Sequence, residues 1–415
     1  MLGVLRKNGF EIVNDVKRAD LAVVNTCGFL QSAIEESIDC ILDVGELKKT
    51  GQLRKLIVAG CVVSRFQGDI KAELPEVDAF IDTNQIPELH KILGEENDDT
   101  LPRVLSTKNH FAYVKVSEGC NRPCTFCIIP KIRGKMRSRT VDSVVKEVTQ
   151  LSGLGVREVN LVAQDLTSFG KDRKEKETLS DLIVGLNKIK NIEWVRLLYA
   201  YPVGTDVELI KNISSLDKIC SYIDIPLQHS SERVLKVMQR PIGRFSPRSI
   251  VKLIKDTASD VHIRTTFIVG FPGETEEDIT DLEQFIREGH FSSVGIFTYS
   301  IEEGTPAGSM DMQISEEEKE ARKERLMKAQ KEVIIEKQKG FIGRTLKVML
   351  EGVHDDTELL LVGRAEFQAP DVDGTVIIND SVIDMEELKQ GDFVKVEITE
   401  VAEYDLIGKV TAICV

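Results

Sequence analysis

Three cysteines lie close together in the stretch EGCNRPCTFC, at Cys120, Cys124 and Cys127. A structural zinc site usually draws four protein ligands from two CxxC or HxxxH pairs. Here no histidine lies within nine residues of the group, and the next cysteine is Cys220, so zinc is a poor fit. A four-iron cluster takes one thiolate per iron, so three cysteines leave one iron open to another ligand. The spacing therefore predicts a catalytic iron–sulfur cluster, because three incidental cysteines in one short loop would be a rare coincidence.

Six strand-like runs follow residue 106, and segments of helical period separate them. The runs are FAYVKVS (111–117), EVNLVAQ (158–164), WVRLLYA (194–200), YIDIPLQ (222–228), HIRTTFIVG (262–270) and VGIFTYS (294–300). Six βα units predict a partial, TIM-like (βα)6 barrel over residues 106–335, a fold that places its chemistry on loops at the carboxyl ends of strands. The cysteine stretch follows the first run, so we expect it at that face.

The first 97 residues have the pattern of a separate, doubly wound α/β domain. Strand-like runs at 20–25, 55–60 and 77–82 alternate with helical segments. Cys27 and Cys61 each follow one of these strands closely, at the sheet edge where ligands collect in such folds. The acidic stretch GEENDDTLPR (94–103) then predicts a domain boundary.

The end of the chain predicts a long helix followed by a small β-barrel. Ser315 is the expected N-cap, with Glu318 completing a capping box and Gly340 ending the helix. Five short β-rich runs with glycine turns follow, and they predict a closed barrel over 340–415. Residues 341–415 hold sixteen Asp and Glu against six Lys and Arg, an excess of ten negative charges in a chain whose net charge is -14. Such a surface is either simply well solvated or repels phosphate and attracts a basic partner.

The overall composition favours a cytoplasmic protein. No run of about 18 apolar residues is present, so we expect no membrane span. The start, MLGVLRKNGFEIV, lacks the apolar core and cleavage site of a signal peptide. Eight cysteines in 415 residues are too sparse for a disulfide scaffold and are better explained as metal ligands, nucleophiles or small core residues.

The motif CNRPCTFC, with Phe126 before its last cysteine, resembles the signature loop of radical S-adenosylmethionine (SAM) enzymes. The resemblance implies that Cys120, Cys124 and Cys127 hold a four-iron, four-sulfur (4Fe-4S) cluster and that SAM chelates the fourth iron. Electron transfer into the sulfonium then yields a 5′-deoxyadenosyl radical. The same resemblance implies a position near the adenine for Phe126.

Weaker candidates for contacts with this cofactor lie further along the chain. TFIVGFPGE (266–274) resembles the segment near the adenosyl group in these enzymes, where Gly270 and Gly273 would let the backbone approach a ligand closely; an ordinary Gly-Pro turn is the alternative. Gln164 ends the run LVAQ and could contact substrate or cofactor, or hydrogen-bond a loop. The basic run KIRGKMRSR (131–139) could offset negative charge at the site or be a solvated loop.

The longer match GCNRPCTFCIIPKIRGKMRSR, together with the three-part layout, resembles the radical SAM methylthiotransferases. That family binds an auxiliary 4Fe-4S cluster through three cysteines of its N-terminal domain, and Cys27 and Cys61 match two of them. The third ligand belongs to a loop after a first strand, and the chain begins where the following helix should be. We therefore expect that strand and cysteine upstream of residue 1; the alternative is an auxiliary site that lacks one ligand. One SAM methylates a sulfur held at the auxiliary cluster, and a second SAM supplies the radical that activates a substrate C–H bond.

Two substrate classes divide this family: tRNA adenosines, and an aspartate of the twelfth protein of the small ribosomal subunit (S-twelve). The C-terminal barrel resembles a TRAM domain of OB type, and a basic barrel would be expected for tRNA; this one is acidic. LVAQDLTSFG, EEGTPAG, EFQAPDVDG and EYDLIGKV resemble the ribosomal-protein branch. We therefore expect the basic S-twelve protein as partner, free or on the ribosome, with an electron donor such as flavodoxin or ferredoxin, and tRNA as the less favoured alternative.

Two functions of another class compete with this interpretation. A non-catalytic electron carrier would normally close its cluster with a fourth cysteine. An RNA-binding module should present a basic face with stacking aromatic residues, whereas the barrel offers only Phe341, Phe367, Phe393 and Tyr404. Formation of 5′-deoxyadenosine under reducing conditions separates both from the radical enzyme.

Overall fold

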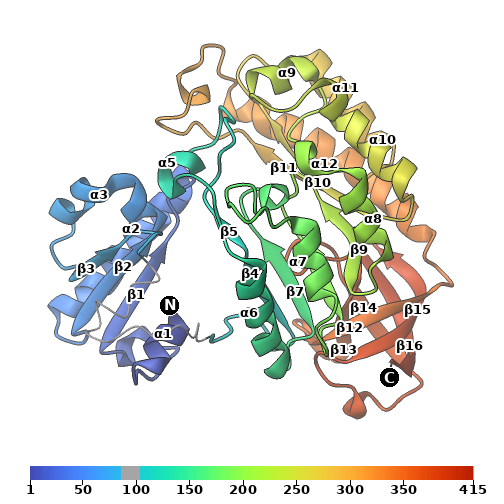
Figure 1. Cartoon of the computed structure of the whole chain (residues 1–415), viewed down its shortest axis with the longest axis horizontal. Coiled ribbons are helices and arrows are strands. Elements are labelled where there is room, and N and C mark those ends of the chain that lie inside the picture. Colours follow the sequence, from blue (N-terminus) through green and yellow to red (C-terminus); the bar gives the residue numbers. More distant parts are fainter. Residues whose placement is uncertain (86–102, 415) are drawn as a thin grey trace. The chain divides into compact units, whose positions relative to one another are not determined.

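The computed structural model describes residues 1–85 and 103–414, so most of the predicted boundary stretch 94–103 lies outside the described residues. The chain forms two compact units (Figure 1). Unit 1 consists of Met1–Ser106, Gly119–Met136 and Ser300–Ser309, and unit 2 consists of Thr107–Glu118, Arg137–Tyr299 and Met310–Val415. No helix in the described ranges is long and apolar enough to cross a membrane.

Unit 1 contains a parallel three-stranded sheet with helices on both faces. Its elements are α1 (Leu2–Lys7), η1 (Val16–Arg18), β1 (Leu21–Thr26), α2 (Gln31–Lys49), β2 (Lys55–Gly60), α3 (Cys61–Glu73), β3 (Ala79–Ile81) and α5 (Ile129–Arg133), with strand order β1-β2-β3. Side chains alternate along a strand: Leu56 and Val58 pack with residues of α2 and α3, whereas Ile57 and Ala59 pack with Leu5 of α1. This arrangement confirms the predicted doubly wound domain.

Unit 2 contains the predicted six-stranded parallel sheet. Its strands are β4 (Phe111–Lys115), β7 (Glu158–Val162), β8 (Trp194–Leu197), β9 (Ile219–Asp224), β10 (His262–Val269) and β11 (Ser293–Thr298), and the order β11-β10-β9-β8-β7-β4 places β4 and β11 at opposite edges. A short hairpin, β5 (Ser117–Glu118) and β6 (Arg137–Ser138), stands beside it.

Helices cover the outer face of this sheet (Figure 1). They are α6 (Val141–Gly153), α7 (Leu179–Leu186), α8 (Val207–Ser215), α9 (Glu232–Val237), α10 (Pro247–Thr257), α11 (Glu276–Arg287) and α12 (Glu316–Lys339). Among them, α6 packs with α7, α7 with α8, α8 with α10 and α11 with α12. Ser315 caps α12 by accepting the N–H of Glu318, and Gly340 follows the last helical residue, as predicted. The Glu318 carboxylate binds Arg322 instead of returning to Ser315, so the reciprocal half of the predicted capping box is wrong.

Strand β9 is shorter at its carboxyl end than the predicted run 222–228, since it ends at Asp224. Pro226 has no backbone N–H and so cannot continue the ladder of hydrogen bonds. Gln228 then takes a left-handed conformation with φ of 74° and forms an isolated bridge to Phe267. Regular strand pairing therefore ends four residues before the end of the predicted run, although Gln228 still contacts β10.

The last part of unit 2 is a closed five-stranded barrel, as predicted. Its strands are β12 (Thr345–His354), β13 (Thr357–Ala365), β14 (Val376–Ser381), β15 (Phe393–Ala402) and β16 (Asp405–Ile413), joined in the order β12-β13-β14-β16-β15. All pairs are antiparallel except β14 with β16. Aliphatic residues such as Val348, Ile378 and Val410 fill its interior. Closure removes the unpaired edges that a small sheet would otherwise expose.

A buried ionic network joins this barrel to the parallel sheet within unit 2. Glu158, the first residue of β7, is fully buried and accepts hydrogen bonds from Arg196 (3.0 Å) and from Arg364 of β13 (2.6 Å). Burial alone would raise the pKa of Glu158, but the charges of Arg364 and Arg196 outweigh it and lower that pKa. Arg364 also contacts Glu351, whose carboxylate lies 3.0 Å from Nε2 of His110.

We predict that Glu158→Ala strongly destabilises unit 2. The substitution leaves Arg196 and Arg364 buried without their shared counter-ion, which costs about 3–5 kcal/mol. Glu193, in contrast, pairs with Lys347 at 2.9 Å on the surface, so Glu193→Ala is expected to cost no more than about 1 kcal/mol. Urea unfolding of both variants measures the difference, and equal losses would contradict the assigned role of the buried network.

Acid is expected to weaken the same network. Burial alone would raise the pKa of Glu351, but the hydrogen bond from His110 and the charge of Arg364 lower it to about 2, below the usual value of about 4.3. Because the folded-state pKa is depressed, the stabilisation from Glu351 is complete above the unfolded-state pKa and is lost as the pH falls toward 2. Urea midpoints measured across this range should fall less steeply in Glu351→Gln than in the parent chain.

Candidate functional site

The predicted cluster loop lies in unit 1 and begins at a glycine that no other residue could replace without strain. Gly119 has φ of 80°, and a Cβ there would lie 2.4 Å from the Lys135 carbonyl oxygen. Cys120 is buried and donates its N–H to the Gly134 carbonyl at 3.1 Å, so the two ends of the loop are held together. The N–H of Arg122 points at Sγ of Cys120 from 3.5 Å.

The other two cysteines of the loop are half-buried, and the N–H of Cys127 donates to the carbonyl of Cys124 at 3.2 Å. Phe126, between them and also half-buried, belongs to the same unit. Within the described ranges, no three His, Cys, Asp or Glu side chains converge closely enough to hold a single metal ion. The fit of the loop to a larger iron–sulfur cluster therefore rests on its donor set, three thiolates in one loop, and on the amide directed at one of the sulfurs.

Two glycines bring the N-terminal cysteines into adjacent loops. Cys27 follows β1 and is exposed, and Cys61 is the buried first residue of α3. A Cβ on Gly28 would lie 2.7 Å from the backbone carbonyl group of Cys61, and a Cβ on Gly60, with φ of 111°, would lie 2.6 Å from the carbonyl oxygen of Thr26. Each loop therefore approaches the other through a position where a larger residue does not fit.

The cluster loop packs against the second of these cysteines. Nη2 of Arg133, in α5, donates to Sγ of Cys61 at 3.3 Å, and Ile128 and Ile132 pack around the same residue. Arg133 belongs to the basic run 131–139, so this part of the run has a specific contact and is not only a solvated loop. Unit 1 thus contains all five cysteines predicted as ligands.

The segment Ser300–Ser309 is the third component of unit 1. Glu302 is 2% exposed and pairs with Arg65 at 3.1 Å, and the same Arg65 nitrogen donates to the Gly28 carbonyl at 2.9 Å. Glu302 also accepts a hydrogen bond at 3.3 Å from the N–H of Gln31, the first residue of α2. The N–H of Ala307 donates to the carbonyl of Thr125 at 3.0 Å. The sequence analysis missed these residues, although it quoted the stretch EEGTPAG that contains Glu302 and Ala307.

The remaining predicted cofactor contacts lie in unit 2. Gly270 and Gly273 have φ of 73° and 75°, and a Cβ on Gly270 would lie 2.2 Å from the side chain of Lys319. The turn after β10 therefore needs its glycines for its own conformation and packing. Gln164 follows β7, and its Oε1 is buried without a hydrogen-bond partner in the described ranges. A hydrogen bond to a loop does not account for this oxygen, which keeps Gln164 a candidate for ligand contact.

A buried His–Glu–Arg group supports the turn at Gly270 and was also missed. Glu274 accepts the N–H of Gly270 at 2.8 Å and a hydrogen bond from Arg322 at 2.7 Å. Nδ1 of His229 accepts the N–H of Ser231 at 3.0 Å, which assigns the proton of a neutral ring to Nε2, 3.3 Å from the Glu274 carboxylate. Glu274 stands in the quoted TFIVGFPGE, but its side-chain partners His229 and Arg322 come from distant parts of the sequence.

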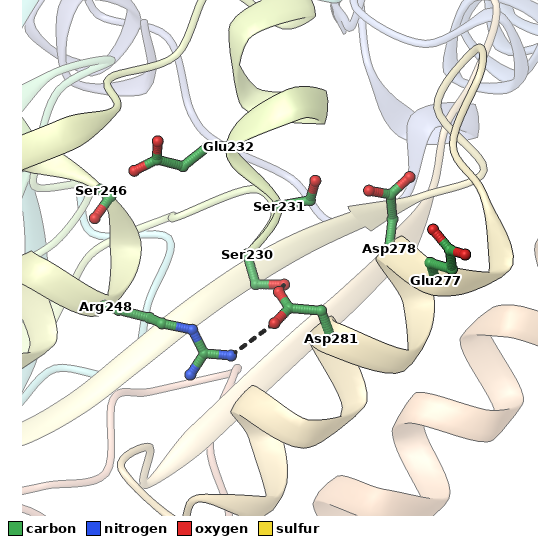
Figure 2. A pocket seen from close by; sticks show the side chains of 8 residues that line it. All are labelled: Ser230, Ser231, Glu232, Ser246, Arg248, Glu277, Asp278 and Asp281. Carbon is green, nitrogen blue, oxygen red and sulfur yellow. Dashed lines mark hydrogen bonds and ion pairs between the residues drawn. The ribbon is translucent and has the colours of Figure 1, made fainter.

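A polar pocket of about 330 Å³ in unit 2 contains none of the predicted site residues (Figure 2). It is lined by Ser230, Ser231, Glu232, Ser246, Arg248, Glu277, Asp278 and Asp281. Asp281 accepts hydrogen bonds from Ser230 (2.6 Å) and Arg248 (2.9 Å). Burial alone would raise the pKa of Asp278, but hydrogen bonds from Ser231, Thr275 and Arg233 lower it to about 2. Asp278 is therefore ionised at neutral pH, which does not suit a general acid.

Three protein families match successive parts of the chain. Residues 1–82 match the Uncharacterized protein family UPF0004, residues 114–286 match the Radical SAM superfamily, and residues 342–411 match the TRAM domain. All three ligands of the predicted SAM cluster lie inside the second match, and Cys27 and Cys61 lie inside the first.

Curated relatives match nearly the whole chain. It is 44% identical to the ribosomal protein uS12 methylthiotransferase RimO of Syntrophotalea carbinolica, with 99% of this chain and 92% of the relative covered. The identity is 43% to the protein of the same name from Pelobacter propionicus (99% and 94% covered) and 42% to that of Aquifex aeolicus (99% and 93%).

Among solved structures, the radical SAM methyltransferase TsrM from Kitasatospora setae, with tryptophan and a SAM analogue bound, matches with a TM-score of 0.54. The match is 12% identical and covers 74% of this chain and 70% of that one. A similarity at this identity supports the fold alone.

We predict that Gly28→Ala disturbs the adjacent cysteine loops. The new Cβ would overlap the backbone of Cys61, so the melting temperature should fall and less iron should be retained after anaerobic reconstitution. Gly68→Ala is the matched control in α3, because a Cβ there meets nothing within 4 Å and should stabilise the helix by about 0.5–1 kcal/mol. Equal melting temperatures and iron contents for both variants would contradict the close approach described above.

Proposed function

This chain belongs to the family of ribosomal protein uS12 methylthiotransferases, and we propose that it attaches a methylthio group to the β-carbon of an aspartate in uS12. The observation that carries the proposal is the match to these relatives over 99% of the chain. In this proposal each predicted domain has its own role: residues 1–97 bind the auxiliary cluster, residues 106–335 carry out the radical chemistry, and residues 340–415 form the TRAM-like barrel.

Cys120, Cys124 and Cys127 would hold the 4Fe-4S cluster, with SAM on the iron that lacks a cysteine. Bound together, these groups supply the electron and the 5′-deoxyadenosyl radical that takes a hydrogen atom from the substrate carbon. The chain contributes the donor set and the N–H of Arg122, which points at Sγ of Cys120 and offsets negative charge on that sulfur.

The residues predicted to contact the adenosyl part of SAM keep these roles in the proposal. We assign Phe126 to the adenine, by family resemblance, and Gln164 to a polar group of cofactor or substrate. The unpartnered Oε1 of Gln164 supports the second assignment, since a buried acceptor without a donor is costly. Gly270 and Gly273 would keep the turn after β10 free of side chains.

Cys27 and Cys61 would contribute to the auxiliary cluster, which holds the sulfur that becomes the methylthio group. The glycines beside them, Gly28 and Gly60, allow the two loops to approach closely. Arg133 donates to Sγ of Cys61 and would offset the negative charge of a thiolate-ligated cluster at this position.

The charge of the C-terminal barrel favours a basic protein over tRNA as substrate. Residues 341–415 hold sixteen acidic against six basic side chains, and the exposed hairpin between β12 and β13 carries Asp355, Asp356 and Glu358. Opposite charges on two partners speed their encounter, whereas an acidic surface opposes contact with phosphates. We propose that the reaction takes place in the cytoplasm and that flavodoxin or ferredoxin delivers the electron.

The test is to incubate the reconstituted chain anaerobically with SAM, a reductant and either uS12 or tRNA. We expect uS12 to gain the mass of one methylthio group less one hydrogen, and 5′-deoxyadenosine to appear. Cys124→Ala should abolish 5′-deoxyadenosine formation because one iron loses its thiolate, whereas Cys40→Ala, on the exposed side of α2, should have no effect. Modification of tRNA alone would overturn the proposed substrate.

A further inference from the structure

We propose that Glu302 is a positioning residue that fixes the separation of the two cysteine groups in unit 1. The inference rests on the proposed two-cluster reaction, in which sulfur from one site must meet a carbon activated at the other. It concerns a continuous path of contacts, here called the Glu302 bridge: Gly28, Arg65, Glu302, Thr305, Ala307 and Thr125.

The first half of the bridge runs from Glu302 to the loop of Cys27. Its Oε2 pairs with Nη1 of Arg65 at 3.1 Å, and that nitrogen also donates to the carbonyl of Gly28 at 2.9 Å. Its Oε1 accepts the N–H of Gln31 at 3.3 Å. Helix α2 has no side-chain cap from its own N-cap residue, Leu30, so the Glu302 carboxylate supplies both the acceptor and the negative charge that a helix N-terminus favours.

The second half runs from Glu302 to the cluster loop. The backbone carbonyl of Glu302 accepts hydrogen bonds from the N–H (3.2 Å) and the side-chain hydroxyl (2.7 Å) of Thr305, and these two bonds fix a tight turn. Two residues later, the N–H of Ala307 donates to the carbonyl of Thr125, between Cys124 and Cys127. A Cβ on Gly308 would lie 2.6 Å from the Glu302 carbonyl oxygen, so the turn closes around this residue without space for another side chain.

Burial makes this path rigid. Glu302, Thr305, Ala307 and Thr125 are each at most 3% exposed, and the side chains of the Arg65–Glu302 pair are 11% and 3% exposed. A buried ion pair cannot exchange its partner for water at low cost, so each charge holds the other in one geometry. Glu302 is the point at which both halves meet, since its carboxylate serves one loop and its carbonyl serves the other.

The neighbouring Glu303 provides a matched control. It has the same charge and an exposed side chain, and it enters the bridge only through its backbone carbonyl, which accepts from Arg65 at 3.4 Å. Glu303→Gln therefore removes one negative charge from the same segment and keeps the path intact. Arg65→Met removes only the half of the bridge that reaches Gly28.

Hydrogen exchange on the full-length, iron-free chain tests the bridge directly. Glu302→Ala should speed amide exchange in residues 27–34 by about tenfold or more, since hydrogen bonds to a charged group are lost. Gly308→Ala, whose Cβ would overlap the Glu302 carbonyl oxygen, should speed exchange in residues 121–127. Arg65→Met should speed exchange in 27–34 alone, and Glu303→Gln in neither segment. If Glu302→Ala unfolds the whole unit, Glu302→Gln decides, with a smaller increase expected in residues 27–34. Unchanged exchange in both segments would overturn the inference.

A second measurement tests what the bridge is for. In the reconstituted enzyme, Glu302→Gln should still cleave SAM but should form severalfold more 5′-deoxyadenosine per methylthiolated uS12 than the parent chain or Glu303→Gln. A ratio equal to that of the parent would show that Glu302 does not couple the two sites. If the parent chain itself modifies no uS12, the proposed function fails, while hydrogen exchange still decides whether the bridge exists.

Discussion

The cysteine loops depend on close backbone approach at glycines. Where Gly28 meets Cys61 and Gly60 meets Thr26, atoms of neighbouring loops come so near that a single methyl group would overlap them. Gly119 has the same role at the entrance to the cluster loop. Short loops of this kind have few conformations left, so the sulfurs they carry are positioned by the backbone rather than by flexible side chains. That is suited to a multi-iron cluster, whose ligands must hold several metal–sulfur distances at once.

Buried charges then connect segments that are far apart in the sequence. In unit 1 the Arg65–Glu302 pair bridges 237 positions, and in unit 2 the Glu158–Arg364 pair bridges 206. In both cases a carboxylate is shared by several donors, which is the arrangement that makes a buried charge tolerable. On the surface of the last barrel, acidic residues such as Asp355, Asp356 and Glu358 are exposed to solvent. Buried charges thus hold distant segments of the chain in place, whereas the exposed acidic residues of the barrel favour a basic binding partner.

Local sequence patterns predicted the elements well because their causes are local. Short strand-like runs separated by segments of helical period identified all six strands of the parallel sheet, and Ser315 identified the start of α12. The prediction was wrong where one residue overrides the pattern: Pro226 ends the hydrogen-bond ladder after β9, although 222–228 is apolar throughout much of its length. It was silent on Glu302 and Glu158, because a charged residue in a strand-rich sequence gives no sign of a partner more than two hundred positions away.

Unit 1 combines segments that the sequence order assigns to different domains. By sequence, two of these segments belong to the six-stranded parallel sheet of unit 2. The cluster loop follows β4 and β5, and Ser300–Ser309 follows β11, the last strand of that sheet. By packing, both segments belong with the N-terminal sheet that carries Cys27 and Cys61. The two edge strands of the parallel sheet therefore each lead directly into the unit that contains every predicted cluster ligand. The proposed reaction, in which sulfur from one cysteine group meets a carbon activated at the other, would benefit from this arrangement, because the separation of the two groups is then set inside one compact unit.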